Sequence, residues 1–250
     1  MGKRKLGAAI ALAKASADPA LAALDFVIEW KPFFLSHDAP RHPDAPLSAC
    51  SLAHHRRRGA LCAGVAAIAP RPANPRARAA LQLLLFPDKM EHYNAKFGAS
   101  RVAAMIPQMK RNGLSVDPPI RFSYGGTIGS TLDSHRLISW SMQRGGEAAQ
   151  DKFVEAAFSA YFEQEKNIAS HDVLLEAVGV AGLDVGAARA FLASDELERE
   201  TLAEASALQR GMQISGVPYF VMGDKYAVSG AQDSAAFLRV FAKLAEEAEK

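Results

Sequence analysis

The sequence predicts an α/β fold on the basis of three observations. Aromatic and β-branched residues are frequent between Asp25 and Leu35, where Pro32 ends a predicted strand. Helical periodicity then covers most of residues 88–212. Near the C-terminus, Gly223 and Asp224 separate two short strands that form a predicted hairpin before a last amphipathic helix. The predicted order is therefore helix, strand, helical block, strand, hairpin strand and helix.

The composition suits a globular protein and excludes two classes of partner. The chain has 250 residues, 49% hydrophobic and 22% charged, which is enough for one or two domains with a substantial core. The segment from His37 to Ala79 has seven arginines, no lysine and two aspartates, so the remaining 22 basic and 25 acidic residues leave the rest of the chain at −3. Because the basic charge belongs to one segment, we expect no nucleic-acid partner. No apolar run reaches the roughly 18 residues of a membrane span, so we expect no membrane partner.

The two cysteines, Cys50 and Cys62, are separated by eleven residues. This spacing is neither a Cys-x-x-Cys pair nor a disulfide framework, and so few cysteines suit a reducing compartment, which predicts a cytoplasmic location. His54 and His55 lie between them, but the spacing matches no common zinc site, so we expect no metal. The oligomeric state is not predicted by any feature of the sequence.

The first helix is predicted before Asp18 and Pro19, which end it. Its apolar face carries Leu6, Ile10 and two alanines, as in an alanine-rich amphipathic helix. The basic start and the later Ala-x-Ala pattern also resemble a short secretory signal, although Lys14 interrupts the apolar stretch.

Three regions are expected along the chain. Residues 36–87 are rich in alanine, proline, arginine and histidine without periodicity, which predicts an irregular, disordered insertion. This composition is also typical of translated non-coding sequence, so an error in the exon structure is an alternative. Residues 88–212 form a predicted helical insertion domain, and residues 1–35 and 213–250 form the other domain.

The helical block is divided by glycine and proline. One helix is predicted from Lys89 to Lys110, bent or broken at Pro107, and another starts at Ser130 and stops at Gly145 and Gly146. The further helices are predicted over Glu147–Tyr161, Ser170–Val178, Val185–Ala193, Glu196–Arg210 and Asp233–Ala245.

The most specific stretch is Gly216, Val217 and Pro218 at the start of the first hairpin strand. Proline at a strand start loses no needed hydrogen bond, and Gly216 gives the backbone freedom before it. If the Val217–Pro218 bond is cis, Val217 turns its N–H and C=O toward the surface, where an extended peptide or glutathione can pair with them. The alternative is an ordinary proline at a strand start.

Several motifs resemble the DsbA-like, FrnE-type family of thioredoxin-fold oxidoreductases. They are the Gly-Lys-Arg-Lys-Leu run from Gly2, the Thr-Leu-Asp-Ser-His-Arg-Leu run of residues 131–137, Ala-Phe-Leu-Ala-Ser at 190–194, and residues 216–232. The resemblance covers about residues 1–35 and 88–245. It implies a thioredoxin-like fold with a helical insertion domain. It also implies that the dithiol motif would lie immediately upstream of Gly2, so that the first strand and both thiols are missing.

The resemblance also implies which residues bind substrate. Val217, Pro218 and Gly216 would hold the partner, with contacts from the turn at Ser130, where the family usually has asparagine. His135 could donate to a ligand, although a capping or core-edge histidine is the commoner role.

The expected activity is therefore that of a thiol-disulfide oxidoreductase family, with a thiol- or disulfide-bearing peptide, a protein or glutathione as partner and no cofactor. Without a Cys-x-x-Cys, we expect no catalytic residue and no dithiol turnover in this chain. One alternative is the kappa-class glutathione transferase and hydroxychromene carboxylate isomerase group, and another is a non-catalytic peptide- or glutathione-binding module. A missing first strand would leave two sheet edges unpaired, and the apolar run Leu81–Phe86 is a candidate to fill that gap.

Overall fold

The computed structural model describes residues 1–34, 87–214 and 216–248. Its helices are α1 (Gly2–Lys14), α2 (Pro19–Ala23), α5 (Lys89–Phe97), α6 (Ala99–Leu114), α7 (Leu132–Phe162), α8 (His171–Val180), α9 (Val185–Leu192), α10 (Glu198–Gly211) and α11 (Ser234–Ala248). Its strands are β1 (Tyr219–Met222) and β2 (Tyr226–Ser229). Three predicted features fall outside the described residues: residues 36–86 of the predicted 36–87 insertion, the pair Cys50 and Cys62 with the histidines between them, and the Leu81–Phe86 run.

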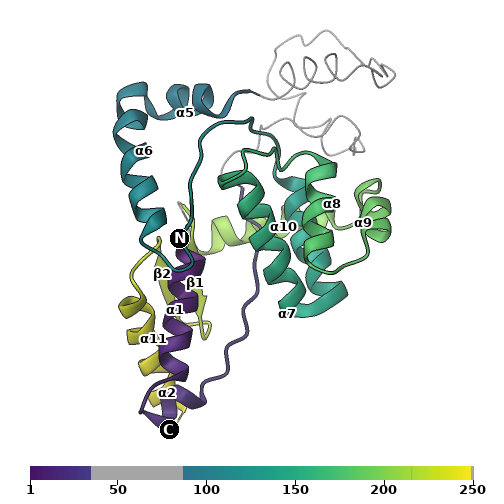
Figure 1. Cartoon of the computed structure of the whole chain (residues 1–250). Helices are drawn as coiled ribbons and strands as arrows, with labels where there is room; N and C mark the ends of the chain where they lie inside the picture. Colours follow the sequence, from purple (N-terminus) through teal and green to yellow (C-terminus); the bar gives the residue numbers. More distant parts are fainter. Residues whose placement is uncertain (35–86, 215, 249–250) are drawn as a thin grey trace, which may run out of the picture.

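A hairpin packed on two helices forms one part of the molecule (Figure 1). β1 and β2 are antiparallel, with Phe220 opposite Val228. Both side chains point into a core that contains Leu6 of α1 and Phe237 and Phe241 of α11. The rings of Phe220 and Phe237 meet edge to face, with centroids 5.0 Å apart. The hairpin is therefore held by the apolar faces of the first and last helices of the chain.

The helices α7, α8 and α9 form a second core. Trp140 and Phe153 of α7 pack with Leu174 of α8 and Phe191 of α9, and all four side chains are buried. The predicted stop near Gly146 is a kink, because this residue has a φ of 68° and a ψ of −166° and the helix resumes directly after it. Only glycine adopts this conformation without strain.

The helix predicted from Lys89 to Lys110 is broken at Gly98 and not at Pro107, where the sequence predicted a bend or a break. Gly98 has a φ of 85° and separates α5 from α6, while its N–H donates to the carbonyl of Asn94. Pro107 stays inside α6. Its side chain is exposed, so water can hydrogen-bond the carbonyl that a proline leaves without an N–H partner.

The segment from Leu24 to Phe34 is extended but is not a strand, which corrects the strand predicted for Asp25 to Leu35. Side chains of α7 take the place of a neighbouring strand. The N–H of Trp30 donates to Oε1 of Gln150 over 2.9 Å, and Nε2 of Gln150 donates to the Trp30 carbonyl over 3.3 Å. The N–H of Ile28 likewise donates to Glu147 over 3.3 Å. Residue type alone predicted an extended backbone here, but a strand also needs a strand partner.

Among the described residues, no helix is long and apolar enough to cross a membrane.

Candidate functional site

The loop before β1 lies against the first turn of α1. A Cβ atom on Gly2 would lie 2.7 Å from Cγ of Pro218 and 3.0 Å from Cζ of Phe220, both closer than side chains pack. Glycine is therefore what allows the proline ring to touch the helix. The Val217–Pro218 peptide bond is cis, and Val217 is 48% exposed. At Gly216 an added Cβ would meet no atom within 4 Å.

Val217 lies in a bend just before the hairpin. The carbonyl of Pro218 accepts a hydrogen bond from the N–H of Gly230 over 2.8 Å, so Pro218 points its carbonyl toward the end of β2. Val217 precedes Pro218 outside the strand register, so it has no partner residue in β2. Within the described part of the chain, its N–H and C=O make no backbone hydrogen bond. The site thus offers a donor and an acceptor beside a helix N-terminus.

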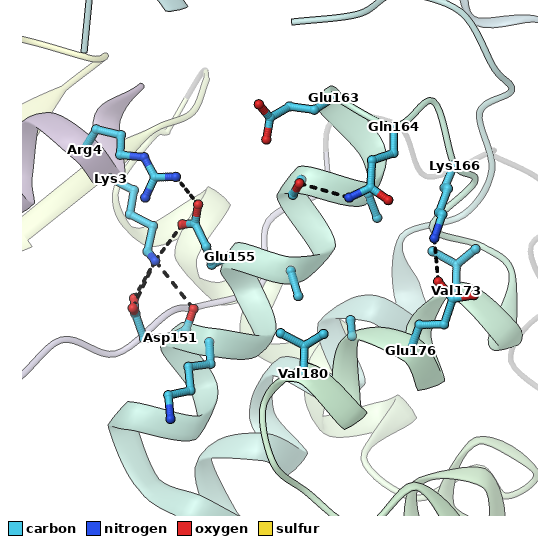
Figure 2. A pocket seen from close by; sticks show the side chains of 15 residues that line it. Lys3, Arg4, Asp151, Glu155, Glu163, Gln164, Lys166, Val173, Glu176 and Val180 are labelled. Atoms are coloured by element: carbon cyan, nitrogen blue, oxygen red, sulfur yellow. Dashed lines mark hydrogen bonds and ion pairs between the residues drawn. The ribbon is translucent and has the colours of Figure 1, made fainter. Parts of the chain in front are cut away.

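Ion pairs connect the first turn of α1 to the second half of α7. Nζ of Lys3 lies 3.0 Å from Asp151 and 2.8 Å from Glu155, and Arg4 also pairs with Glu155 (Figure 2). Partial burial alone would raise the pKa of Glu155, but hydrogen bonds and charges from Lys3 and Arg4 hold it below its ordinary value. Glu155 is therefore ionised at neutral pH and joins the two parts of the molecule.

Two hollows flank these charged side chains. The larger, about 630 Å³, has Val173, Ala177 and Val180 of α8 on its apolar side, and Lys3 and Arg4 at one end (Figure 2). The smaller, about 280 Å³, is bordered by the same two cations together with Trp30 and Pro118. Both hollows reach Lys3 and Arg4 in the first turn of α1.

The described residues contain no sulfur nucleophile, because Cys50 and Cys62 are the only cysteines of the sequence and both lie in the part that is not described. No dithiol can therefore be placed beside Pro218 within residues 1–34, 87–214 and 216–248. In the same residues, no group of three histidine, cysteine or acidic side chains could hold a metal ion.

Two of the predicted binding residues, His135 and Ser130, lie at the start of α7. His135 packs edge-on against Phe34 with ring centroids 4.9 Å apart, and its Nδ1 is buried without a hydrogen-bond partner in the described part of the chain. Burial lowers the pKa of His135 to about 4, although a backbone hydrogen bond with Phe33 acts in the opposite direction. Oγ of Ser130 accepts a hydrogen bond from the N–H of Leu132 over 3.2 Å. In this structure both side chains support the start of α7.

Asp133 and Arg136, on the same helix as His135, were not predicted as important, yet among the described residues they form the most buried ion pair. Arg136 is fully buried and donates to Asp133 over 2.8 Å, and to the carbonyls of Ser194 over 2.7 Å and Glu196 over 2.9 Å. Burial would raise the pKa of Asp133, but hydrogen bonds from His171 and Arg136 lower it. The pair fixes the turn between α9 and α10 to α7. The sequence feature that could have revealed this ion pair is an aspartate and an arginine three positions apart on an otherwise apolar helix face.

Lys89 is a second buried charge that the sequence did not reveal. Lys89 is 2% exposed, and its Nζ donates a hydrogen bond to the carbonyl of Tyr161 over 2.9 Å. The same Nζ lies 3.9 Å from the centre of the Tyr161 ring. Burial lowers the pKa of Lys89, while Glu165 and Asp88 act in the opposite sense. The contact attaches the start of α5 to the end of α7.

The hairpin on two helices, the proline loop at a helix N-terminus and the separate helical core together define a thioredoxin fold with a helical insertion. Residues 80–242 match the family model described as the DSBA-like thioredoxin domain, and the chain belongs to this family. The predicted DsbA-like family and the thioredoxin-like fold with a helical insertion are thereby confirmed, and the family is one of thiol-disulfide oxidoreductases.

One solved structure supports the same assignment. It is the crystal structure of a probable DsbA oxidoreductase from Streptomyces coelicolor, with a TM-score of 0.54 and 26% sequence identity. The match covers 62% of this chain and 65% of that protein, so the chain spans about two thirds of the length of this relative. No curated protein matches the chain.

The contact between Gly2 and Pro218 gives a first prediction. Gly2→Ala should lower the free energy of unfolding by about 1–3 kcal/mol, because the new methyl group overlaps a proline ring that cannot rotate away. Gly7→Ala, on the same helix with no atom within 4 Å of the new methyl group, should instead raise it by about 0.5–1 kcal/mol. Urea unfolding followed by circular dichroism measures both. Equal effects of the two substitutions would show that the contact is not tight.

A second prediction concerns pH. The pKa of His135 is about 4 in the folded chain and ordinarily 6.5, so the unfolded chain binds the proton first as the pH falls. Stability should therefore decrease from about pH 6.5 toward pH 4, by at most about 1.4 kcal/mol per pH unit from this group. His135→Leu should flatten that slope. Urea unfolding midpoints of both proteins, measured from pH 8 to pH 4.5, test this. The difference between the two proteins at pH 8 reports the effect of the substitution on packing alone. An unchanged slope in His135→Leu would contradict the prediction.

Proposed function

We propose that this chain binds an extended thiol- or disulfide-bearing peptide, or glutathione, at the Val217–Pro218 loop, and that it does not itself carry out dithiol exchange. The observation that carries the proposal is the packing of Pro218 on Gly2. It sets an exposed Val217, whose N–H and C=O make no backbone hydrogen bond within the described residues, beside the N-terminus of α1.

Main-chain pairing is the chemistry that this site supports. An extended peptide can accept from the N–H of Val217 and donate to its C=O, which is the β-augmentation mode of recognition. The cations Lys3 and Arg4 border the hollows beside the same helix end, although Asp151 and Glu155 already neutralise them. A peptide main chain, which is neutral, suits this balance of charge.

The family chemistry needs a thiolate that attacks a disulfide and a second thiol that resolves the mixed disulfide. The sequence has no Cys-x-x-Cys to supply that pair. We therefore assign binding and not turnover to the 250-residue chain. Its low cysteine content suits a reducing compartment, and we propose a cytoplasmic location on that basis.

A binding experiment tests the first half of the proposal. Isothermal titration with reduced glutathione, and with a short cysteine-containing peptide, should show saturable binding to the full chain. Val217→Pro removes the N–H and should weaken binding by tenfold or more, whereas Val217→Ile keeps the N–H and should leave the affinity within about twofold. Thermal midpoints establish that both variants are folded. Equal affinities of the two variants would place the ligand elsewhere.

An insulin-reduction assay tests the second half. The chain should not accelerate the reduction of insulin by dithiothreitol above the rate without protein, because no dithiol lies at the helix N-terminus. The Cys50→Ser, Cys62→Ser double variant is the control. A rate proportional to protein concentration that disappears in the double variant would assign turnover to these two thiols and contradict the proposal.

A further inference from the structure

The extended segment of residues 24–34 crosses from one core of the molecule to the other. Phe26 and Ile28 pack on the core of the first part, which consists of α1, α2, β1, β2 and α11, whereas Trp30 packs on the core of the second part, α7 to α10. The closely packed pairs of elements lie within one part or the other, such as α1 with α11 and α7 with α8. The two parts are therefore separate bodies that this segment connects.

Charged side chains make a second connection, between α1 and α7. Among the described residues, the hydrogen bonds and ion pairs that join these two helices all come from Lys3 and Arg4, which pair with Asp151 and Glu155. The side chains of Asp151 and Glu155 are 50% and 34% exposed. Both hollows adjoin the ion pairs, because Lys3, Arg4 and Asp151 border each of them. The larger hollow is shown in Figure 2.

The two connections respond differently to salt. Ion pairs between partly exposed groups are weak, and dissolved ions screen them. Gln150 is instead 1% exposed and uncharged, and its side-chain amide bonds both the N–H and the C=O of Trp30. Salt therefore weakens the contact between α1 and α7 and leaves the attachment of Trp30 to α7 intact.

We propose that Lys3, Arg4, Asp151 and Glu155 form an ionic clasp that holds the two parts closed and that opens as the ionic strength rises. When the clasp opens, the parts swing about Trp30, which stays attached to α7. The two hollows then join into one cleft along the first turn of α1, because the residues of the clasp separate them. This inference concerns the movement of the two parts and does not depend on ligand binding at Val217.

The test measures the distance between the two parts in the full chain. Leu12→Cys on α1 and Ala190→Cys on α9, both at exposed positions, carry a donor and an acceptor dye, after Cys50→Ser and Cys62→Ser have removed the other thiols. Single-molecule fluorescence energy transfer should show one main population in dilute salt. A second population should grow by about threefold or more between about 10 mM and 1 M salt, because the Debye length falls from roughly 30 Å to 3 Å.

A reference pair of labels lies within the second part. Ala190→Cys and Ala207→Cys are at exposed positions on α9 and α10. Because both helices belong to the same part, this pair should show one population at both salt concentrations. A second population that appears equally in the reference pair would show that the second part itself loosens, and would overturn the inference.

A matched pair of substitutions identifies the charges responsible. Glu155→Gln removes the carboxylate that Lys3 and Arg4 share, so the second population should already be present in dilute salt and should change little when salt is added. Glu176→Gln is the control, because Glu176 borders the same larger hollow but pairs with Lys166 inside the second part. It should behave like the unsubstituted chain. Circular dichroism establishes that both variants are folded, and the salt titration of the unsubstituted chain requires neither of them.

Three results would overturn the inference. A single population at every salt concentration in the unsubstituted chain would show that other contacts hold the parts together. Two populations of similar size in dilute salt would show that the ion pairs do not keep the parts closed. Equal effects of Glu155→Gln and Glu176→Gln would show that the response does not belong to the contact between α1 and α7.

Discussion

The contact between Pro218 and the first turn of α1 is the constraint on which the site depends. With no side chain on Gly2, the proline ring and Phe220 both reach the helix, and Phe220 continues into the core beside Leu6 and Phe237. The same contact fixes the position of the chain just before β1, where Val217 is exposed. Packing inside the fold thus decides which main-chain groups a ligand can reach, without any contribution from the reactivity of a side chain.

The two parts of the molecule are joined by contacts of unequal strength. Lys3 pairs with Asp151, whose side chain is 50% exposed, and ion pairs of this kind contribute only about 0–1 kcal/mol. Gln150 is 1% exposed and bonds both the N–H and the C=O of Trp30. Loss of its side-chain amide would leave buried backbone groups unsatisfied, at a cost of about 1–3 kcal/mol. The relative position of the two cores therefore depends more on Gln150 than on the visible salt bridges at the helix end.

Sequence patterns located elements whose boundaries are set by local chemistry. The hairpin turn, the proline before β1 and the helices after α7 lie close to their predicted positions, because glycine, proline and hydroxyl caps act on their immediate neighbours. The segment around Trp30 could not be predicted in the same way. Whether an extended backbone becomes a strand depends on what lies beside it, and here that neighbour is a glutamine side chain from a residue 120 positions away.

How much of the candidate site the sequence could predict depends on whether a residue is defined by backbone preference or by burial. The cluster of Gly216, Val217 and Pro218 is defined by backbone preferences, and the structure places it beside a helix N-terminus, with Val217 exposed. The role of His135 depends on burial, which sequence does not specify, and its ring packs on Phe34. Arg136 was missed because a single buried arginine is recognisable only from the three carbonyls and the carboxylate that surround it.

The thioredoxin-like architecture separates recognition from chemistry, and this chain shows how far the separation can go. The recognition proposed for Val217 uses backbone groups, which every sequence possesses and which only the fold must orient. Exchange requires sulfur at a helix end, where the N-terminal dipole and free N–H groups stabilise a thiolate. The packing of Pro218 on Gly2 and the exposure of Val217 involve no thiol, so the binding proposed for this chain depends on the fold and not on sulfur chemistry.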